Sequence, residues 1–154
     1  MTKMQTGSDS DPGLIALLIQ ANKALHRRTS EELLGMRLKA FLLLGYVRDR
    51  GAVSQQELET GLLMDANSVV LLLNETEAAG FSVRRRDPAD RRRHMVELTA
   101  SGRAAVERAE NAREGIEDEV LSDLSPDERK TLRKLLRRVL EGLLRVPAES
   151  QSQV

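Results

Sequence analysis

The residues best suited to bind a charged partner lie between Arg84 and Arg93, a stretch with six arginines and two aspartates. This stretch has a net charge of +4 in a chain that is neutral overall, so the remaining residues sum to −4. Clustered guanidinium groups bind phosphate oxygens well because they remain protonated and donate through a planar fork. A charged run is more often an ordinary solvated surface, and that is the favoured interpretation of this stretch taken alone.

Two short runs of alternating polar and apolar residues flank the arginines and predict a basic β-hairpin. Phe81 and Val83 alternate with polar residues before the arginines, and Val96 and Leu98 do so after them. A period of two residues is typical of half-buried strands. Asp-Pro and Asp-Arg lie between the two runs and favour a tight turn.

Two short helices are predicted immediately before this hairpin. Ser54-Gln55-Gln56-Glu57 is a capping box that begins a helix ending near Leu62. Asp65 caps a second helix, which continues to Ala79 and stops at Gly80. Two helices joined by a tight turn and followed by a basic hairpin predict a winged helix-turn-helix, in which the second helix can enter a major groove.

Longer helices are predicted on both sides of this lobe. The first begins at Asp11-Pro12 and runs to Leu34, with Gly35 as its stop. The next, between Arg37 and Arg50, is apolar on more than one side and should be the most buried helix.

Two helices are also predicted after the hairpin, each with an apolar face. One follows Thr99-Ala100-Ser101-Gly102 and has a narrow seam containing alanine, which permits close helix approach. The other begins at a capping box, Ser125-Pro126-Asp127-Glu128. Its apolar face consists of Leu132, Leu135, Leu136, Val139, Leu140, Leu143 and Leu144. A small central lobe would not cover these faces, so we expect a second copy of the chain to do so.

Composition narrows the class of protein. The chain has 154 residues, is 40% hydrophobic and only 2% aromatic, so leucine, valine and alanine must form the core. It contains no cysteine, which excludes disulfides, thiolate zinc sites and thiol redox switching within the chain. The two histidines, His26 and His94, are too few and too far apart for a metal site, and we expect no cofactor. No apolar run spans a membrane and no signal peptide pattern is present, which predicts a cytoplasmic protein. If the chain binds DNA, it would be nucleoid-associated.

The predicted fold class is therefore mainly α (α+β), with a winged helix-turn-helix between long N- and C-terminal dimerisation helices. The predicted boundaries are a disordered tail at 1–10, dimerisation helices at 11–36 and 99–146, a DNA-binding lobe at 37–98, and a second disordered tail at 147–154.

Several short motifs occur together in the stretch from Leu58 to Gly102 and the arginine that follows it. They are Asp65-Ala66-Asn67-Ser68-Val69, Leu72-Leu73-Asn74, Glu77-Ala78-Ala79-Gly80-Phe81, Arg84-Arg85-Arg86-Asp87-Pro88-Ala89-Asp90-Arg91-Arg92, and Leu98-Thr99-Ala100-Ser101-Gly102-Arg103. In this combination the chain resembles the MarR family of bacterial transcription regulators. The resemblance implies a homodimer that binds a pseudo-palindromic site in double-stranded DNA, usually represses nearby genes, and often releases DNA when a small aromatic ligand binds.

The resemblance and the predicted helix-turn-helix together give candidate DNA contacts. These are Ser54, Gln56, Asn67, Ser68, Arg84, Arg86, Arg91, Arg92 and Arg93. Asn67 and Ser68 would face the groove at the start of the second helix, and Arg91 and Arg92 would occupy the wing tip. Asp90 corresponds to the acidic wing residue of the family, which would orient a neighbouring arginine.

The second helix departs from the family pattern because the residues from Asp65 to Ala79 include three acids and neither lysine nor arginine. This helix should gain little from phosphates, although Asn67 could pair with adenine and Ser68 with a phosphate. Val70 and Leu71 could meet thymine methyl groups or pack against neighbouring helices. The wing is therefore expected to supply most of the affinity for DNA.

Two other classes of function are compatible with a small helical domain of this composition. An enzyme is disfavoured, because no carboxylate lies in a recognisable nucleophile or metal pattern and no glycine-rich phosphate loop is present. An adaptor that keeps the winged fold without binding DNA is the alternative, given the acidic second helix. A ligand site near His26, Arg27-Arg28, Met36 or Tyr46 is conceivable, but surface exposure or core packing is favoured for each, so no ligand residues are assigned.

Overall fold

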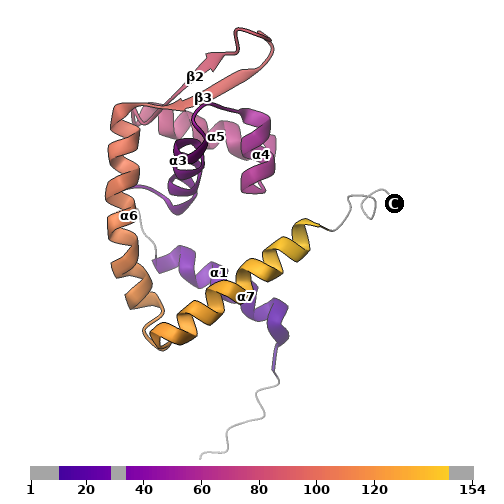
Figure 1. Cartoon of the computed structure of the whole chain (residues 1–154), viewed down its shortest axis with the longest axis vertical. Coiled ribbons are helices and arrows are strands. Elements are labelled where there is room, and N and C mark those ends of the chain that lie inside the picture. The colour runs from indigo at the N-terminus through magenta and orange to yellow at the C-terminus, as the bar shows by residue number, and fades with distance from the viewer. Residues whose placement is uncertain (1–10, 29–33, 146–154) are drawn as a thin grey trace, which may run out of the picture. The chain divides into compact units, whose positions relative to one another are not determined.

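The computed structural model describes residues 11–28 and 34–145. Its elements in chain order are α1 (Gly13–Arg28), α3 (Leu38–Arg50), β1 (Val53–Ser54), α4 (Gln55–Leu62), α5 (Ala66–Ala78), β2 (Ser82–Arg86), β3 (His94–Leu98), α6 (Ala100–Val120) and α7 (Pro126–Leu144) (Figure 1). The chain divides into two compact units, and the division along the sequence falls between Ile116 and Glu117 within α6. The predicted fold class is confirmed. The predicted domain boundaries stay a prediction, and both predicted tails lie outside the described residues.

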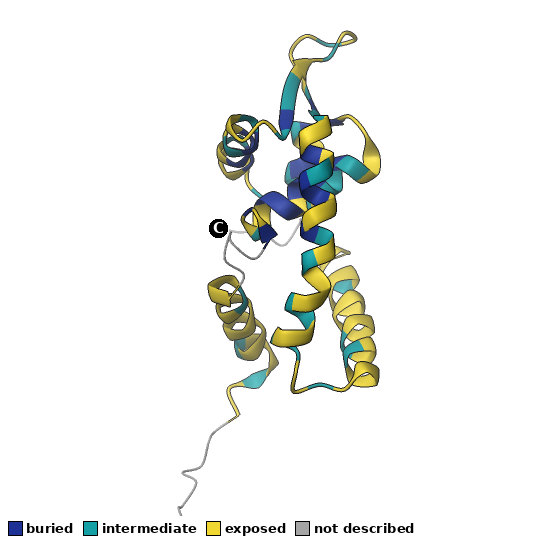
Figure 2. Cartoon of the chain, turned by 90° about the vertical axis from the view of Figure 1, so that its left-hand side faces the viewer, coloured by how far each residue is buried: buried dark blue, intermediate teal, exposed yellow. Residues whose placement is uncertain are grey.

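Helix α3 is the centre of the first unit. Five of its residues are buried, more than in any other described helix: Ala40, Phe41, Leu43, Leu44 and Val47. They pack against Leu58 of α4, Leu73 of α5, Val96 of β3 and Val106 of α6, which are all 0% exposed. The buried residues in Figure 2 gather on these elements. The prediction that this helix is the most buried is confirmed.

The strands form a three-stranded antiparallel sheet with the order β1-β3-β2. The predicted hairpin is β2 and β3, in which Arg84 is paired with Val96 and Arg86 with His94. Strand β1 was not predicted. Its two residues pair with Val96 and Met95, and two residues are too few to show an alternating pattern.

The buried face of β2 differs from the predicted one. Alternation assigned the inward face to Phe81 and Val83, whereas the structure buries Ser82, at 2% exposure, and leaves Phe81 and Val83 half-buried. Burial of a serine is tolerated because its hydroxyl is hydrogen-bonded to Thr76, 2.7 Å away. The β3 strand follows the prediction more closely, since Val96 is fully buried and Leu98 half-buried.

The first helix, predicted to reach Leu34, is described as far as Arg28, and residues 29–33 lie outside the described ranges. Gly35 adopts a φ of 72°, a conformation that favours glycine and ends a helix. Neither α1 nor α7 contains a buried residue. Within the described residues, no helix is both long and apolar enough to cross a lipid bilayer.

Helix α7 begins at the predicted capping box. The Ser125 hydroxyl accepts the Glu128 amide at 3.2 Å, and the Glu128 carboxylate accepts the Ser125 amide at 3.0 Å. Arg129 fixes the preceding turn by donating to the carbonyls of Leu121 and Leu124 and by pairing with Asp118 at 2.6 Å. The apolar face of α7 is exposed in the single chain, with exposures from 43% at Leu136 to 66% at Leu143.

Candidate nucleic-acid interface

The turn between α4 and α5 is fixed by local hydrogen bonds. The Ser54 hydroxyl caps α4 by accepting the Glu57 amide at 3.1 Å. Leu63 ends α4 in the left-handed conformation, with a φ of 54°. Asp65 then caps α5 by accepting the Ser68 amide at 3.2 Å. Hydrogen bonding from Ser68, first from its side chain and then from its amide, holds the pKa of the Asp65 carboxyl below its ordinary value. A short turn with both helix starts capped is the geometry that presents α5 as a recognition helix.

Helix α5 is divided into an inner and an outer side. Val69, Leu72, Leu73 and Thr76 are buried and hold the helix on the core. Asn67, Ser68 and Asn74 are exposed. Leu71 is 60% exposed, so it is available at the surface, whereas Val70 is half-buried. The polar residues at the start of α5 are therefore presented to solvent.

Two of the three acidic side chains from Asp65 to Ala79 are neutralised by arginines from other elements. Glu75 pairs with Arg37, whose Nε lies 2.8 Å from the carboxylate. Glu77 pairs with Arg84 of β2 at 2.7 and 2.9 Å, and the Arg84 guanidinium lowers the pKa of the Glu77 carboxyl. The sequence argument counted these charges as free. Their pairing reduces the repulsion that α5 would exert on a phosphate backbone.

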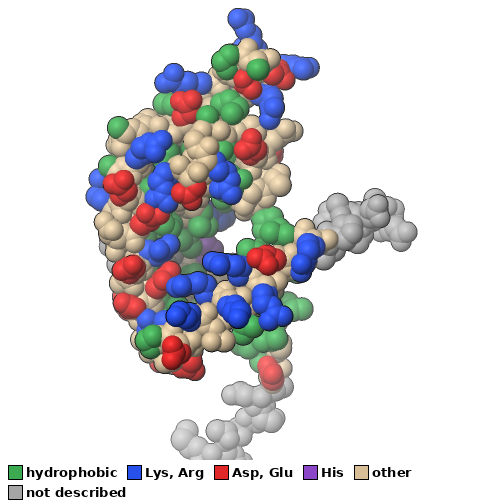
Figure 3. Space-filling view, in the orientation of Figure 1, with side chains coloured by type: hydrophobic (Ala, Val, Ile, Leu, Met, Phe, Trp, Pro, Cys, Tyr) green, Lys and Arg blue, Asp and Glu red, His purple; other side chains and the backbone are tan. Residues whose placement is uncertain are grey.

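The wing tip is a tight turn closed by its aspartates. The Asp87 amide donates to the Arg93 carbonyl at 2.9 Å, and the Arg93 amide donates to the Asp90 carbonyl at 2.9 Å. The Asp90 carboxylate accepts the amide of Arg92 at 3.1 Å and its Nε at 3.2 Å, and the hydrogen bond from the amide lowers the pKa of the Asp90 carboxyl. The Arg92 side chain is nevertheless 91% exposed. Basic side chains gather at this tip in Figure 3.

A groove of about 310 Å³ lies beside the wing. It is lined by Ser54, Gln55, Gln56, Glu59, Ala66, Arg92, Arg93 and His94, which come from the starts of α4 and α5, the wing turn and the start of β3. The structure thus brings four candidate contacts, Ser54, Gln56, Arg92 and Arg93, around one groove.

Comparison with curated proteins gives relatives that are transcription regulators, although no protein-family model matches the chain. The uncharacterized HTH-type regulator YdgJ of Bacillus subtilis is 31% identical over 96 residues, covering 62% of this chain and 58% of YdgJ. A putative regulatory protein for the hcr operon of Thauera aromatica is 32% identical, covering 69% and 64%. The chain thus spans less than two thirds of either relative. PecS of Dickeya dadantii, also an HTH-type transcriptional regulator, is 31% identical over 133 residues, covering 84% of this chain and 78% of PecS.

Solved structures agree with these relatives. A crystal structure of MarR has a TM-score of 0.80 and 29% identity, covering 91% of this chain and 97% of that one. The chain belongs to the MarR family. A mutant MarR from Escherichia coli bound to operator DNA has a TM-score of 0.73 and 28% identity, covering 82% and 93%. BpsR of Bordetella bronchiseptica, described with the regulation of its DNA binding by 6-hydroxynicotinic acid, has a TM-score of 0.70 and 28% identity, covering 80% and 96%.

The MarR-family motif from Leu98 to Arg103 has a visible structural role at Thr99 and Gly102. The Thr99 hydroxyl donates to the Gly80 carbonyl at 2.6 Å and accepts the Gly102 amide at 2.9 Å. A Cβ atom on Gly102 would lie 2.0 Å from the carbonyl oxygen of Phe81. Only glycine permits this approach, which joins the start of α6 to the residue that precedes β2.

The candidate contacts of this MarR-family chain fall into two groups. Gln56, Asn67, Ser68, Arg86, Arg91, Arg92 and Arg93 are all exposed. Ser54 is 2% exposed and caps α4, which argues against its predicted contact with DNA. Arg84 points toward α5 and is engaged there. The DNA contacts themselves stay predictions.

Sequence reasoning missed the partners of Arg84 and Glu75. Arg37 and Glu75 are 38 residues apart, and Arg84 lies on the face of β2 that also carries buried Ser82. No signal in the sequence could have reversed the faces of β2, because a serine between two apolar residues is the ordinary alternation of a half-buried strand.

Proposed function

We propose that this chain is a transcription regulator that binds a pseudo-palindromic operator in double-stranded DNA as a homodimer. One observation carries the proposal: the exposed start of α5, with Asn67 and Ser68, belongs to the same lobe as the exposed arginine tip formed by Arg91, Arg92 and Arg93. An exposed helix start provides base readout, and a basic wing provides phosphate neutralisation and minor-groove contact. The MarR–operator structure supports the same partner, and such binding would place the protein in the nucleoid of the cytoplasm.

The homodimer is supported by the apolar face of α7. Leu135, Leu136, Val139, Leu140, Leu143 and Leu144 are each at least 43% exposed in the single chain. Burying a large apolar side chain fully is favourable by roughly 1.5–3 kcal/mol, so covering six half-exposed residues is a substantial driving force. A second copy covers this face and also supplies the second lobe that a pseudo-palindrome requires.

We further propose repression that is relieved by a small aromatic effector. The solved structure of BpsR, described with regulation by 6-hydroxynicotinic acid, supports this class of ligand. Solved structures of oxidised and reduced MarR from Escherichia coli also exist. This chain has no cysteine, so a thiol switch has no residue to act on. No catalytic role is proposed, because the reported relatives are transcription regulators.

The test measures binding to the DNA upstream of the protein's own gene by fluorescence anisotropy at several salt concentrations. We expect Arg92→Ala to weaken binding by about 1–3 kcal/mol and to lower the salt slope by about one unit per lost contact per wing. Asn67→Ala is the matched variant on the recognition helix. It should leave the salt slope nearly unchanged and relax base preference at one position in each half-site.

Two results would count against the proposal. Absence of measurable binding of the wild-type protein to this DNA and to unrelated DNA, even at low salt, would favour the adaptor without DNA binding. Full affinity and salt slope in Arg92→Ala, together with loss of both in Asn67→Ala, would show that the wing does not dominate binding.

A further inference from the structure

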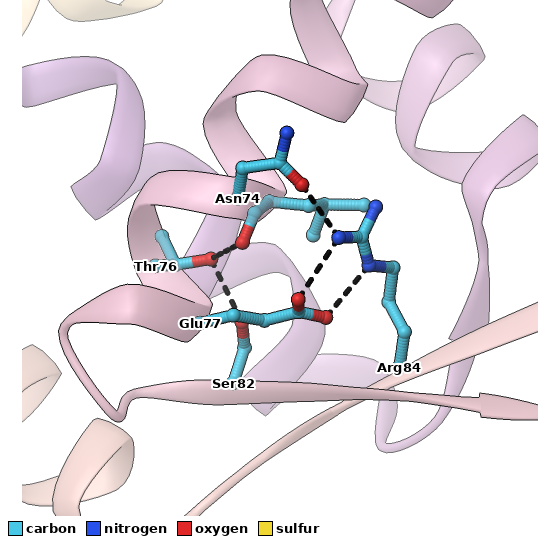
Figure 4. A network of polar contacts seen from close by, with 6 residues as sticks. Asn74, Thr76, Glu77, Ser82 and Arg84 are labelled. Atoms are coloured by element: carbon cyan, nitrogen blue, oxygen red, sulfur yellow. Dashed lines mark hydrogen bonds and ion pairs between the residues drawn. The ribbon is translucent and has the colours of Figure 1, made fainter.

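One wing arginine differs from the others in its surroundings. The Nε of Arg84 donates to Glu77 at 2.7 Å, and its Nη2 donates to Glu77 at 2.9 Å and to Asn74 at 2.6 Å (Figure 4). The Arg84 side chain is 23% exposed, compared with 70% for Arg85 and 91% for Arg92. Arg84 therefore already has three hydrogen bonds to the recognition helix.

The hydrogen bonds of Arg84 lie where they can limit the movement of the wing tip. Among the described hydrogen bonds between β2 and α5, the bond from Ser82 to Thr76 is nearest the base of the wing, and those of Arg84 are nearest the tip. At about 3.3 Å per residue, the chain from Arg84 to the turn at Ala89 spans about 16 Å, so a tilt of about 10° at the stem would move the tip by about 3 Å. A displacement of that size exceeds the tolerance of a hydrogen bond.

We propose that Arg84 is a positioning residue that fixes the wing relative to the recognition helix by bridging Glu77 and Asn74, and that it does not contact DNA. The effects on DNA binding that this proposal predicts rest on the proposed function, whereas the attachment of the wing to α5 does not. A bidentate arginine–carboxylate pair defines direction as well as distance, because both groups are planar. A pair of this kind sets the angle between the two elements that must reach adjacent grooves at once.

The two possible roles of Arg84 predict opposite effects for Glu77→Gln. If Arg84 were a phosphate ligand, weakening its carboxylate partner would free it, and DNA affinity and salt slope would rise. If Arg84 positions the wing, Glu77→Gln weakens binding about three- to ten-fold with the salt slope unchanged. Arg84→Gln should then have the same effect, and the double variant should be no weaker than either single variant.

Arg84→Lys separates charge from geometry. It keeps the positive charge but lacks the fork that reaches Glu77 and Asn74 together. The positioning role predicts that Arg84→Lys binds DNA as weakly as Arg84→Gln, whereas a phosphate contact predicts that it retains most of the wild-type affinity.

A measurement without DNA distinguishes failure of this proposal from failure of the proposed function. Hydrogen exchange of the β2 and β3 amides in the free protein should accelerate about three- to ten-fold in Arg84→Gln and equally in Glu77→Gln. The matched control is Arg86→Gln, which changes an exposed arginine at the end of β2 and should leave exchange unchanged. Unchanged hydrogen exchange in both Arg84→Gln and Glu77→Gln, or higher DNA affinity in Glu77→Gln, would overturn the proposal.

Discussion

The buried hydroxyl pair between α5 and β2 gives a sharp test of how the wing is attached. Thr76 and Ser82 are 1% and 2% exposed, and their hydroxyl oxygens are 2.7 Å apart. The Thr76 hydroxyl also donates to the Leu73 carbonyl at 3.2 Å. A hydroxyl has one proton, so Thr76 donates to Leu73 and Ser82 donates to Thr76. No buried side-chain polar atom in the described part of the chain lacks a partner.

Because of this hydrogen-bond direction, Ser82→Ala and Thr76→Val should lower the free energy of unfolding by different amounts. Ser82→Ala removes one hydrogen bond but leaves Thr76 bonded to Leu73, so the free energy of unfolding should fall by about 0.5–1.5 kcal/mol. Thr76→Val keeps the side-chain shape but leaves the buried Ser82 hydroxyl without its acceptor, and should cost about 1–3 kcal/mol. Adding Ser82→Ala to Thr76→Val removes the orphaned hydroxyl. The double variant should therefore be at least as stable as Thr76→Val alone.

Urea unfolding followed by circular dichroism measures these differences, at one fixed protein concentration because a dimer is stabilised by mass action. Thr131→Val is the matched control, since Thr131 is an exposed helical threonine whose hydroxyl donates to the Asp127 carbonyl at 3.1 Å. It should change stability by less than about 0.5 kcal/mol. Additive effects of Thr76→Val and Ser82→Ala, or a larger cost for Ser82→Ala than for Thr76→Val, would refute the assigned direction.

Three further outcomes follow from the structure. Gly102→Ala should lower the free energy of unfolding by about 1–3 kcal/mol in thermal melts, because its Cβ would lie 2.0 Å from the Phe81 carbonyl. Gly115→Ala is the control, because a Cβ added at Gly115 would meet no atom of another element within 4 Å, and it should not destabilise the protein. Equal losses of stability in Gly102→Ala and Gly115→Ala would contradict the close contact between Gly102 and Phe81. The Arg84 hydrogen bond lowers the pKa of Glu77 from its ordinary value of 4.5, so its contribution to stability is present above that pH and is lost as the pH falls through the lowered value. Urea titrations between neutral and acidic pH should show this loss in the wild type and a smaller one in Glu77→Gln. Leu136→Glu should dissociate or unfold the dimer in light scattering, and a variant that stays dimeric would show that the exposed face of α7 is not the interface.

The sequence alone determined the features that depend on neighbouring residues. Helix caps join residues three positions apart, so Ser54 and Ser125 could be recognised as helix starts without any tertiary information. The reciprocal bond of a full capping box is present at Ser125. The wing turn was predictable for the same reason, because the Asp90 carboxylate bonds the amide two residues later. The period of the apolar residues identified the exposed face of α7.

The tertiary structure decided which side of each element faces inward. Ser82 is buried because it lies on the face of β2 that packs against α5, and its buried hydroxyl is stable once it is hydrogen-bonded to Thr76. Arg84 lies on the same face of β2 and is directed toward Glu77 of α5. Polarity gives no sign of such burial, since a satisfied polar residue and a solvated one look alike in a sequence.

The charge of the recognition helix was decided in the same way. The sequence fixes how many acids lie between Asp65 and Ala79, but their effect on DNA depends on where the compensating arginines lie. Arg37 reaches Glu75 across 38 residues, a separation with no local pattern to reveal it. Long-range ion pairs require the fold to bring two surfaces together, and only the folded chain shows that most of the acidic charge on α5 is already paired.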